Sequence, residues 1–598
     1  MCGFAGGIRL DGNLPAPGAA AEAARLLTPR GPDGEGHWQE RTPAGAVWMQ
    51  HRRLAILDRA GGEQPMSNET GTVRVVFNGE IYNHADLRRQ LEALGHKFAS
   101  DHSDTEVLVH GWEQWGTELP EHLLGMFAFA LYDRAGGQWF MARDEAGQKP
   151  LYYAADAAGV VCASTLPALL ALGLTEARPA GAQVQQYLQL GYIPAPGTIY
   201  ENIFQLPPQT WALWCGGELT LRRYTSLTVA GPGDLADVLQ AAVARHLQAD
   251  VPLVCFLSGG IDSALIAWAM QLATRRAGGA AITTVSVGFA EADFDESPYA
   301  AEVARILGTR HQRIVVGAHG DVAGGLEALI TEVLGQPFAD SSLWATQQIS
   351  AAARGLGTVA LSGDGGDEIF GGYDRYRGLA LARAWRAAVG WLPDELGTDV
   401  PGGVRWGRLI RAARAADTPG AYARLVELWS GSRELPPVVG PTGTPGEYAQ
   451  SWDWQHYLSG DVLCKVDTAA MSVGLEVRAP LLDPALRAWV RQHRPRLWDG
   501  RRGKLPLRAL AARLFPPAIS ARRKQGFGVP IGTWFRGVLR ENLLDRLLSR
   551  GAYWRAYLPA ATVTDALRAH LTGTADHTHR LYALWVLEMW SGELRGKR

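Results

Sequence analysis

The first 200 or so residues alternate short apolar runs with polar, glycine-containing turns. The runs are rich in Val, Ile, Phe and Trp, which favour β-strands. They read "GAVWMQHRRLAIL", "TVRVVFNGEIYN", "GMFAFALYD", "QWFMARD" and "GVVCAST". Between them, "HADLRRQLEALG" repeats Leu at helical spacing and reaches a stop at Gly95. This pattern predicts an α+β domain built on layered antiparallel sheets with helices, over residues 2–210.

The pattern changes in the following segment, where a double proline and "AGPGD" interrupt the chain. We expect a linker over 211–234. From Leu235 onward, apolar strands alternate with helical stretches, as in "VPLVCFL", "SALIAWAMQLA", "ITTVSVGF", "HQRIVV" and "TVALSG". Such alternation predicts βαβ units and an α/β domain with a parallel sheet, over 235–598. Beyond about Gly378 the pattern is mostly helical.

Length and composition add limits to this picture. A chain of 598 residues exceeds one hydrophobic core, so two to four domains are expected. The hydrophobic share of 47% and charged share of 20% are typical of a globular protein. A net charge of -2 predicts no general attraction to nucleic acid or membranes. No apolar run approaches the length of a membrane-spanning helix, and no signal peptide is expected.

The cysteines are few and scattered: Cys2, Cys162, Cys215, Cys255 and Cys464. They form no CxxC pair and no close Cys/His set, so neither a disulfide framework nor a structural zinc site is expected. We therefore expect a cytoplasmic protein. Cys2 could be an accident of the start. If Met1 is removed, however, its thiol lies beside its own α-amine, a base near neutral pH.

A second candidate site is the turn "FLSGGIDSA", which follows an apolar strand and opens a helix. Its glycines let backbone N–H groups approach an anion, and the helix dipole favours negative charge there. No Walker pattern occurs in the chain. Asp262 beside a phosphate site implies Mg²⁺ between them. The alternative is an ordinary strand-to-helix turn in which Asp262 caps the helix.

Another glycine-rich acidic turn, "LSGDGGDEIFGGY", follows the strand "TVA". Strand ends in a parallel sheet meet at one edge, so this turn is expected beside the first. Asp262 and Asp367 could then hold one Mg²⁺ between phosphates, with Asp364 facing the same site. The alternative is a solvated acidic loop.

Several motifs, in order, resemble one family across nearly the whole chain. "MCGFAGG", "RGPDGEG", "HRRLAILD", "FNGEIYNH" and "SDTEV" resemble class II glutamine amidotransferase domains, which have the N-terminal-nucleophile fold. "LSGGIDSA", "LSGDGGDEIFGGY", "KVDTAAMSVGLEVRAPLLD" and "RRKQGFGVP" resemble the synthetase domain of glutamine-hydrolysing asparagine synthetases, a PP-loop ATP pyrophosphatase fold. The resemblance implies ATP as substrate, Mg²⁺, glutamine as amide donor and L-aspartate as expected acceptor; a homodimer is compatible with it.

In the N-terminal domain the resemblance implies that Cys2 attacks the glutamine amide with its own α-amine as base. Asn78 and Gly79 would form the oxyanion hole. The implied glutamine-binding residues are Arg53, Leu54, Asn78, Gly79, Glu80 and Asp104. Arg53 would hold the carboxylate and the two acids the α-ammonium group. Taken singly, Arg53 could be a surface strand residue, and "FNGEIYN" a hairpin with an Asn-Gly turn.

In the C-terminal domain the resemblance implies ATP binding by Leu257, Ser258, Gly259, Gly260, Asp262, Ser263, Val287, Ser362 and Gly363. Asp262 and Asp367 would bind Mg²⁺. Lys524 would neutralise charge during adenylation and amide formation, and Asp364 would lie near the reacting acyl group. Glu476 would be a packing or conformational acid.

The chain departs from the family pattern at Pro29, Thr165 and Asp364, where relatives often have His, Glu and Glu. These departures leave open an amidotransferase of the same architecture that acts on a different carboxylate. A non-catalytic paralogue is disfavoured because the motif residues are present. A cyclase of the β-lactam synthetase type is disfavoured by the intact Cys2 and "NGE".

Overall fold

The computed structural model describes residues 2–42, 45–227, 229, 233–317, 321–389, 403–429, 434–522 and 528–596. Its N-terminal part contains two six-stranded antiparallel sheets. The first has the order β10-β8-β9-β1-β3-β2 and consists of β1 (Gly3–Arg9), β2 (Gly34–Thr42), β3 (Gly45–Arg53), β8 (Tyr152–Asp156), β9 (Gly159–Ala163) and β10 (Phe204–Gln205). The second has the order β12-β11-β7-β6-β5-β4 and consists of β4 (Met66–Ser67), β5 (Val73–Ile81), β6 (Gly125–Asp133), β7 (Gln138–Arg143), β11 (Thr210–Cys215) and β12 (Glu218–Arg223).

The two sheets stack face to face and are covered by helices on their outer sides. Apolar side chains such as Phe4, Val76 and Met141 fill the space between them. The first sheet is covered by α1 (Pro17–Leu27) and α5 (Leu166–Ala171). The second is covered by α2 (His84–Ala93) and α3 (Glu106–Trp115). This four-layer arrangement is the predicted α+β domain, and α2 occupies the segment whose Leu spacing predicts a helix.

The predicted linker needs a correction. Residues 211–223 lie largely in β11 and β12, and β11 pairs with β7 from Thr210↔Arg143 to Trp214↔Trp139. "TWALWC" therefore extends the second sheet, because its alternate side chains are buried there. The N-terminal part continues at least to Arg223. The predicted outer boundaries of the two domains stay predictions.

The C-terminal part is built on a five-stranded parallel sheet with the order β15-β14-β13-β16-β17. Its strands are β13 (Leu253–Phe256), β14 (Thr283–Phe289), β15 (Arg310–Val316), β16 (Val359–Leu361) and β17 (Glu476–Arg478). Helices α8 (Ile261–Arg276) and α9 (Ser297–Leu307) pack on it, and so do α11 (Leu343–Arg354) and α17 (Leu463–Met471). Four of these strands coincide with predicted apolar runs. The fifth, β17, is three residues long and is not predicted.

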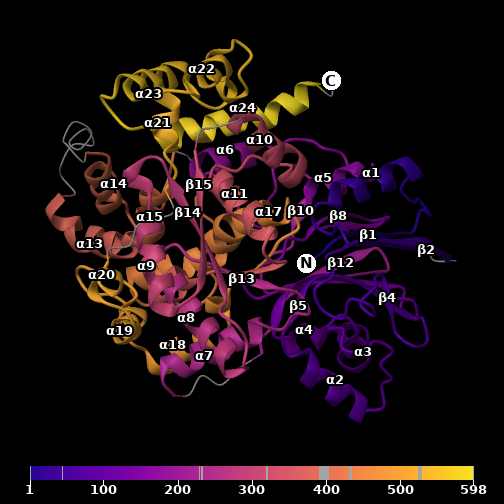
Figure 1. Ribbon diagram of the computed structural model, residues 1–598. Helices are drawn as coiled ribbons and strands as arrows, with labels where there is room; N and C mark the ends of the chain where they lie inside the picture. The colour runs from indigo at the N-terminus through magenta and orange to yellow at the C-terminus, as the bar shows by residue number, and fades with distance from the viewer. Residues whose placement is uncertain are drawn as a thin grey trace.

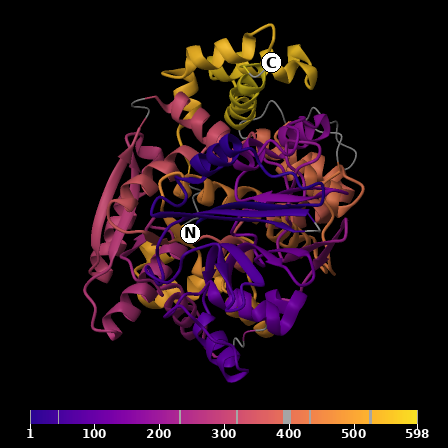
Figure 2. The ribbon, with the colours of Figure 1, turned by 90° about the vertical axis from the view of Figure 1, so that its right-hand side faces the viewer.

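The remaining helices of the C-terminal part surround this sheet. They are α7 (Leu235–His246), α10 (Val322–Ala328), α12 (Gly366–Phe370), α13 (Asp374–Val389), α14 (Gly403–Arg414), α15 (Thr418–Val426), α16 (Pro445–Trp452), α18 (Pro484–His493), α19 (Leu505–Leu514), α20 (Pro517–Ser520), α21 (Ile531–Arg536), α22 (Arg540–Leu548), α23 (Ala560–Thr572) and α24 (Thr578–Gly596). Figures 1 and 2 both place α21–α24, in gold and yellow, together at one end of the molecule. The mostly helical C-terminal region is thus confirmed.

The N-terminus lies at the centre of the molecule, between the indigo strands and the parallel sheet (Figure 1). Buried ion pairs join the two parts there. Arg30 contacts Asp467 through both ends of its guanidinium, at 2.7 and 3.2 Å. Arg478 of β17 contacts Glu80 of β5 at 2.9 Å. Within the described residues, no helix has the length and apolar character needed to cross a membrane.

Candidate functional site

Cys2 lies directly before β1, a central strand of the first sheet, and only 8% of it is exposed. Its backbone nitrogen donates a hydrogen bond to Asn78 Oδ1 at 3.0 Å. Burial raises the pKa of the Cys2 thiol, although a backbone hydrogen bond from Leu54 and the charge of Arg53 oppose this effect. The thiol therefore keeps its proton until a base removes it.

Strand β5 carries the three residues of the "NGE" motif. Asn78 and Glu80, two positions apart, point to the same face of the strand and are both buried, while Gly79 pairs with Phe127 of β6. The amide nitrogen Nδ2 of Asn78 is buried and has no hydrogen-bond partner in the part of the chain that the structure describes. A buried donor without a partner is costly, so this nitrogen is suited to bind an acceptor that arrives with a ligand.

Two buried carboxylates lie near this strand. Glu80 Oε2 accepts a bond from Arg478, and Asp104 Oδ2 accepts one from the backbone nitrogen of Ile81 at 3.0 Å. Burial raises the pKa of Glu80 well above its ordinary range and also raises that of Asp104. A cationic group bound between them would favour their ionised forms. The site can therefore hold an ammonium group.

Arg53, the last residue of β3, is fixed by the loop that follows it. Its Nη1 donates to the carbonyl oxygen of Arg59 at 2.9 Å, and its Nη2 to those of Asp58 at 2.7 Å and Leu57 at 3.3 Å. These bonds involve three of its five N–H groups and set the plane of the guanidinium. Leu54, the next residue, is buried beside Cys2. The residues of the predicted glutamine site thus lie around the N-terminal end of the chain.

The predicted phosphate-binding turn joins β13 to α8. Ser258 and Ser263 hydroxyls are 3.0 Å apart, and the backbone nitrogen of Gly260 donates to Ser258 Oγ at 3.3 Å. Gly259 has a φ of +75°, and a Cβ there would lie 2.7 Å from the Cβ of Tyr299. Only glycine fits this turn without strain.

The second glycine-rich turn, after β16, lies against the first, as predicted from the sheet topology. A Cβ on Gly363 would lie 2.9 Å from the backbone nitrogen of Ser263. The two turns line one cavity of about 900 Å³, the size range of ligand pockets. Its lining includes these predicted residues: Leu257, Ser258, Gly260, Asp262, Ser263, Val287, Ser362, Gly363, Asp364 and Asp367.

Asp262 and Asp367 face each other across the ammonium group of Lys504. Lys504 Nζ contacts both carboxylates, at 2.8 Å from Asp367 Oδ1, and its side chain is 5% exposed. Although burial opposes the effect, the two carboxylates raise the pKa of Lys504, which stays charged. The position between the two acids therefore stabilises a cation, and their oxygen ligands suit Mg²⁺. Lys504 Nζ occupies the position between the two carboxylates in this structure, and Mg²⁺ binding by the predicted pair stays a prediction.

Asp364 lies in the same cavity and accepts a hydrogen bond from Ser362 Oγ at 2.7 Å. Burial raises its pKa. Glu476 is fully buried on β17 and pairs with Arg478 at 2.6 Å. Lys524 lies outside the described residues.

Several charged residues of these sites were not predicted from the sequence: Arg30, Lys465, Asp467, Arg478 and Lys504. Lys504 lies in a basic segment, a pattern typical of solvated surface positions, whereas Lys465, Asp467 and Arg478 lie in the motif "KVDTAAMSVGLEVRAPLLD". Only the tertiary structure brings them to the interface and the cavity. "RGPD", around Arg30, and "KVDTAAMSVGLEVRAPLLD" were the available signals, since both motifs were quoted for the family resemblance.

Comparisons with known proteins agree with this geometry. The family model described as asparagine synthase matches residues 234–592, and the glutamine amidotransferase domain model matches residues 1–225. The chain belongs to the asparagine synthase family.

Two of the three relatives described here match over nearly the whole chain, and the third matches over more than half of it. A putative glutamine-hydrolyzing asparagine synthetase of Mycobacterium tuberculosis (strain H37Rv) is 32% identical over 99% of this chain and 97% of its own. Glutamine-hydrolyzing asparagine synthetase 1 of Bacillus subtilis is 27% identical over 99% and 96%. The asparagine synthetase of Asparagus officinalis is 32% identical over 59% and 56%. The suspected asparagine synthetase family and its two-part organisation are confirmed.

Proposed function

We propose that this chain forms L-asparagine from L-aspartate, glutamine and ATP, with glutamate, AMP and pyrophosphate as the other products. The observation that carries the proposal is the presence of two built sites in one chain. One holds a buried thiol beside an unpartnered amide donor, and the other is a cavity between two glycine-rich turns. The family membership of both parts supports the same reaction.

In the glutamine site, Cys2 attacks the side-chain amide carbon after Met1 is removed. The free α-amine of Cys2, held by Asn78 Oδ1, takes the thiol proton and delivers it to the leaving ammonia. Asn78 Nδ2 and the backbone N–H of Gly79 stabilise the oxyanion of the tetrahedral intermediate. Water then hydrolyses the thioester to glutamate. Arg53 binds the glutamine carboxylate, and Glu80 and Asp104 bind its ammonium group.

In the nucleotide cavity, the backbone N–H groups of residues 258–263 and the N-terminus of α8 hold the phosphates of ATP. Asp262 and Asp367 would hold Mg²⁺, which shields charge between phosphates and carboxylates. The aspartate side chain attacks the α-phosphorus, which gives an acyl-adenylate and releases pyrophosphate. Ammonia then attacks the acyl carbon and displaces AMP. The motif that contains Lys524, which lies outside the described residues, implies that this lysine neutralises charge during adenylation and amide formation.

The wall of this cavity carries both signs of charge, which suits an α-amino acid as acceptor. Lys465 and Asp340 form a partly buried ion pair at 2.9 Å. Burial and the neighbouring Asp340 raise the pKa of Asp461 well above its ordinary range. A bound ammonium group would favour the ionised form of Asp461.

A small cavity between the two parts supports direct transfer of ammonia. Its volume of about 20 Å³ accommodates one water-sized molecule, and Arg30, Arg143, Cys464 and Asp467 are among its lining residues. Ammonia kept from bulk water escapes protonation and remains a nucleophile.

We retain the cytoplasm as the expected compartment, since the five cysteines are free.

The test is pyrophosphate release with ATP, Mg²⁺ and glutamine over a panel of carboxylic acids led by L-aspartate. Mass spectrometry identifies the product, and Cys2→Ala is the control that loses glutamine-dependent synthesis. Aspartate-dependent pyrophosphate matched by asparagine supports the proposal. Glutaminase activity with no response to aspartate would refute it and support a different carboxylate acceptor.

A further inference from the structure

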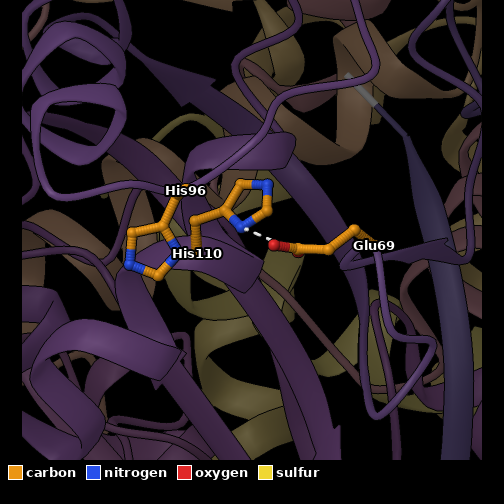
Figure 3. Close-up of side chains that lie close together, drawn as sticks. All are labelled: Glu69, His96 and His110. Atoms are coloured by element: carbon orange, nitrogen blue, oxygen red, sulfur yellow. Dashed lines mark ion pairs between the residues drawn. The ribbon is translucent and has the colours of Figure 1, made fainter.

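Two histidines and two glutamates converge on the outer side of the second N-terminal sheet, away from the residues of both proposed reaction sites. His110 lies on α3, with Glu113 one turn later, and His96 lies in the segment after α2. Glu69 lies in the turn between β4 and β5. Figure 3 shows Glu69, His96 and His110 directed toward one another.

Three of the separations between these side chains are close to those around a tetrahedral metal ion. His110 Nδ1 is 3.2 Å from Glu113 Oε2 and 3.5 Å from Glu69 Oε2, and His96 Nδ1 is 3.6 Å from Glu113 Oε2. Ligands bonded to zinc at 2.0–2.1 Å in a tetrahedron lie about 3.3 Å apart. The candidate ligand atoms of Glu69, His96 and His110 all lie within 4.8 Å of one another, and Glu113 lies against both histidines, so the four side chains must draw together to bind one ion.

The ligand side chains are oriented by further hydrogen bonds and ion pairs. The other ring nitrogen of His110, Nε2, faces Glu106 Oε1 at 3.6 Å. Glu106 is itself fixed by the backbone nitrogens of Ala99 and Ser100 at 2.6 and 2.8 Å. Metal-binding histidines commonly place the second N–H against a carboxylate in this way. Glu113 is similarly held, because its Oε1 accepts a bond from Asn68 Nδ2 at 2.7 Å.

The charges of the cluster also favour a cation. Three carboxylates, those of Glu69, Glu106 and Glu113, face two imidazoles, and His110 is fully buried. With neutral imidazoles the cluster carries three negative charges, which a divalent cation largely balances. Imidazole nitrogen as a ligand favours zinc and similar transition metals over Mg²⁺ or Ca²⁺.

We propose that Glu69, His96, His110 and Glu113 form a structural zinc site that ties the β4–β5 turn to α3 and the segment before it. The expectation of no structural zinc site was drawn from the cysteines. It does not cover this site, whose ligands are histidine and glutamate. The ion would brace β5, which carries Asn78, and the start of α3, two residues after Asp104. Its role is to stabilise the elements that carry the glutamine site.

The test is zinc binding to the full chain after treatment with a chelator, by calorimetry and metal analysis in millimolar Mg²⁺. We expect one equivalent of zinc and a rise of about 5 °C in unfolding temperature at saturation. His96→Ala should abolish zinc binding. Glu69→Gln, a substitution at an exposed residue, should weaken zinc binding at least about tenfold. His37→Ala, an exposed histidine on β2, is the matched control and should bind zinc normally.

Cobalt substitution separates this site from zinc held by the thiol of Cys2. Tetrahedral Co²⁺ bands should persist in Cys2→Ala and disappear in His96→Ala. Equal zinc binding by Glu69→Gln, His96→Ala and the unaltered chain would overturn the proposal. So would an absence of zinc binding by the unaltered chain, and the cluster would then be an ion-pair network with a protonated His110.

Discussion

Replacing Asn78 by alanine tests the glutamine site at the atom that the structure leaves unpartnered. The amide nitrogen of Asn78 is buried with no hydrogen-bond partner among the described residues, while its oxygen holds the nitrogen of Cys2 at 3.0 Å. Loss of one oxyanion donor lowers kcat by about 10²–10³, equivalent to about 2.7–4 kcal/mol of transition-state stabilisation. Loss of the bond to Cys2 adds about 1 kcal/mol in stability or positioning.

The assay is glutamate formation from glutamine, with kcat and KM determined separately. The KM for glutamine should change little, because Arg53, Glu80 and Asp104 remain. Synthesis driven by added ammonium salt should be retained, since it bypasses the glutamine site. Asn83→Ala is the matched control: it removes an amide that bonds to the backbone of His122 and Leu124, outside the site, and should leave kcat unchanged.

Two results would refute this reasoning. A fall in kcat of less than about tenfold would mean that Asn78 Nδ2 is not an oxyanion donor. An equal loss of glutamine-dependent and ammonia-dependent synthesis would mean that the substitution acts through the fold as a whole.

Three further predictions concern buried charges. Lys504→Met should lower the free energy of unfolding by about 3–5 kcal/mol, because it leaves the carboxylates of Asp262 and Asp367 face to face. Urea unfolding should show that Mg²⁺ stabilises this variant more than the unaltered chain. An equal effect of Mg²⁺ on both proteins would contradict the prediction. Burial lowers the pKa of His246 from 6.5 to about 4, so the unfolded chain binds the extra proton and the free energy of unfolding falls as pH drops from 6.5 toward 4. His246→Gln should reduce the slope of unfolding free energy against pH by about 1 kcal/mol per pH unit. Equal slopes for both proteins in urea unfolding would disprove the assignment. Asp467→Asn, which weakens the buried ion pair with Arg30, should lower the ratio of asparagine formed to glutamate released. If mass spectrometry finds the same ratio as in the unaltered chain, ammonia does not pass this ion pair.

The sequence predicted those parts of the fold that depend on local pattern. Strands β13 to β16 follow apolar runs, and the turns after β13 and β16 carry glycines whose spacing is visible in the chain. β17 was missed because "EVR" is short and polar, and its position is set by pairing with β16. β11 and β12 were missed because the neighbouring "PP" and "GG" pairs are typical of linkers and turns. The pairing of β11 with β7 determines the structure of this segment instead.

The candidate sites divide in the same way. Cys2 and Asn78 could be found because each lies in a short motif with its own chemistry. Lys504 could not be found, since a lysine in a basic segment gives no sign of the carboxylates that surround it after folding. Arg478 lies in a quoted motif, but the motif does not reveal its ion pair with Glu80. His96 and Glu69 are separated by 27 positions, and only the packing of α3 against the β4–β5 turn brings them together.

Arg478 contacts both proposed sites, the glutamine site and the nucleotide site, through different atoms. Its guanidinium donates to Glu80, a residue of the proposed glutamine site, and its carbonyl oxygen accepts a bond at 2.9 Å from the backbone nitrogen of Ser362, in the proposed nucleotide site. The two proposed substrate sites thus both contact this one residue. Any change that nucleotide binding makes in glutamine affinity must be matched by an equal change that glutamine makes in nucleotide affinity. The two measurements, made independently, provide a thermodynamic check on communication through this one residue.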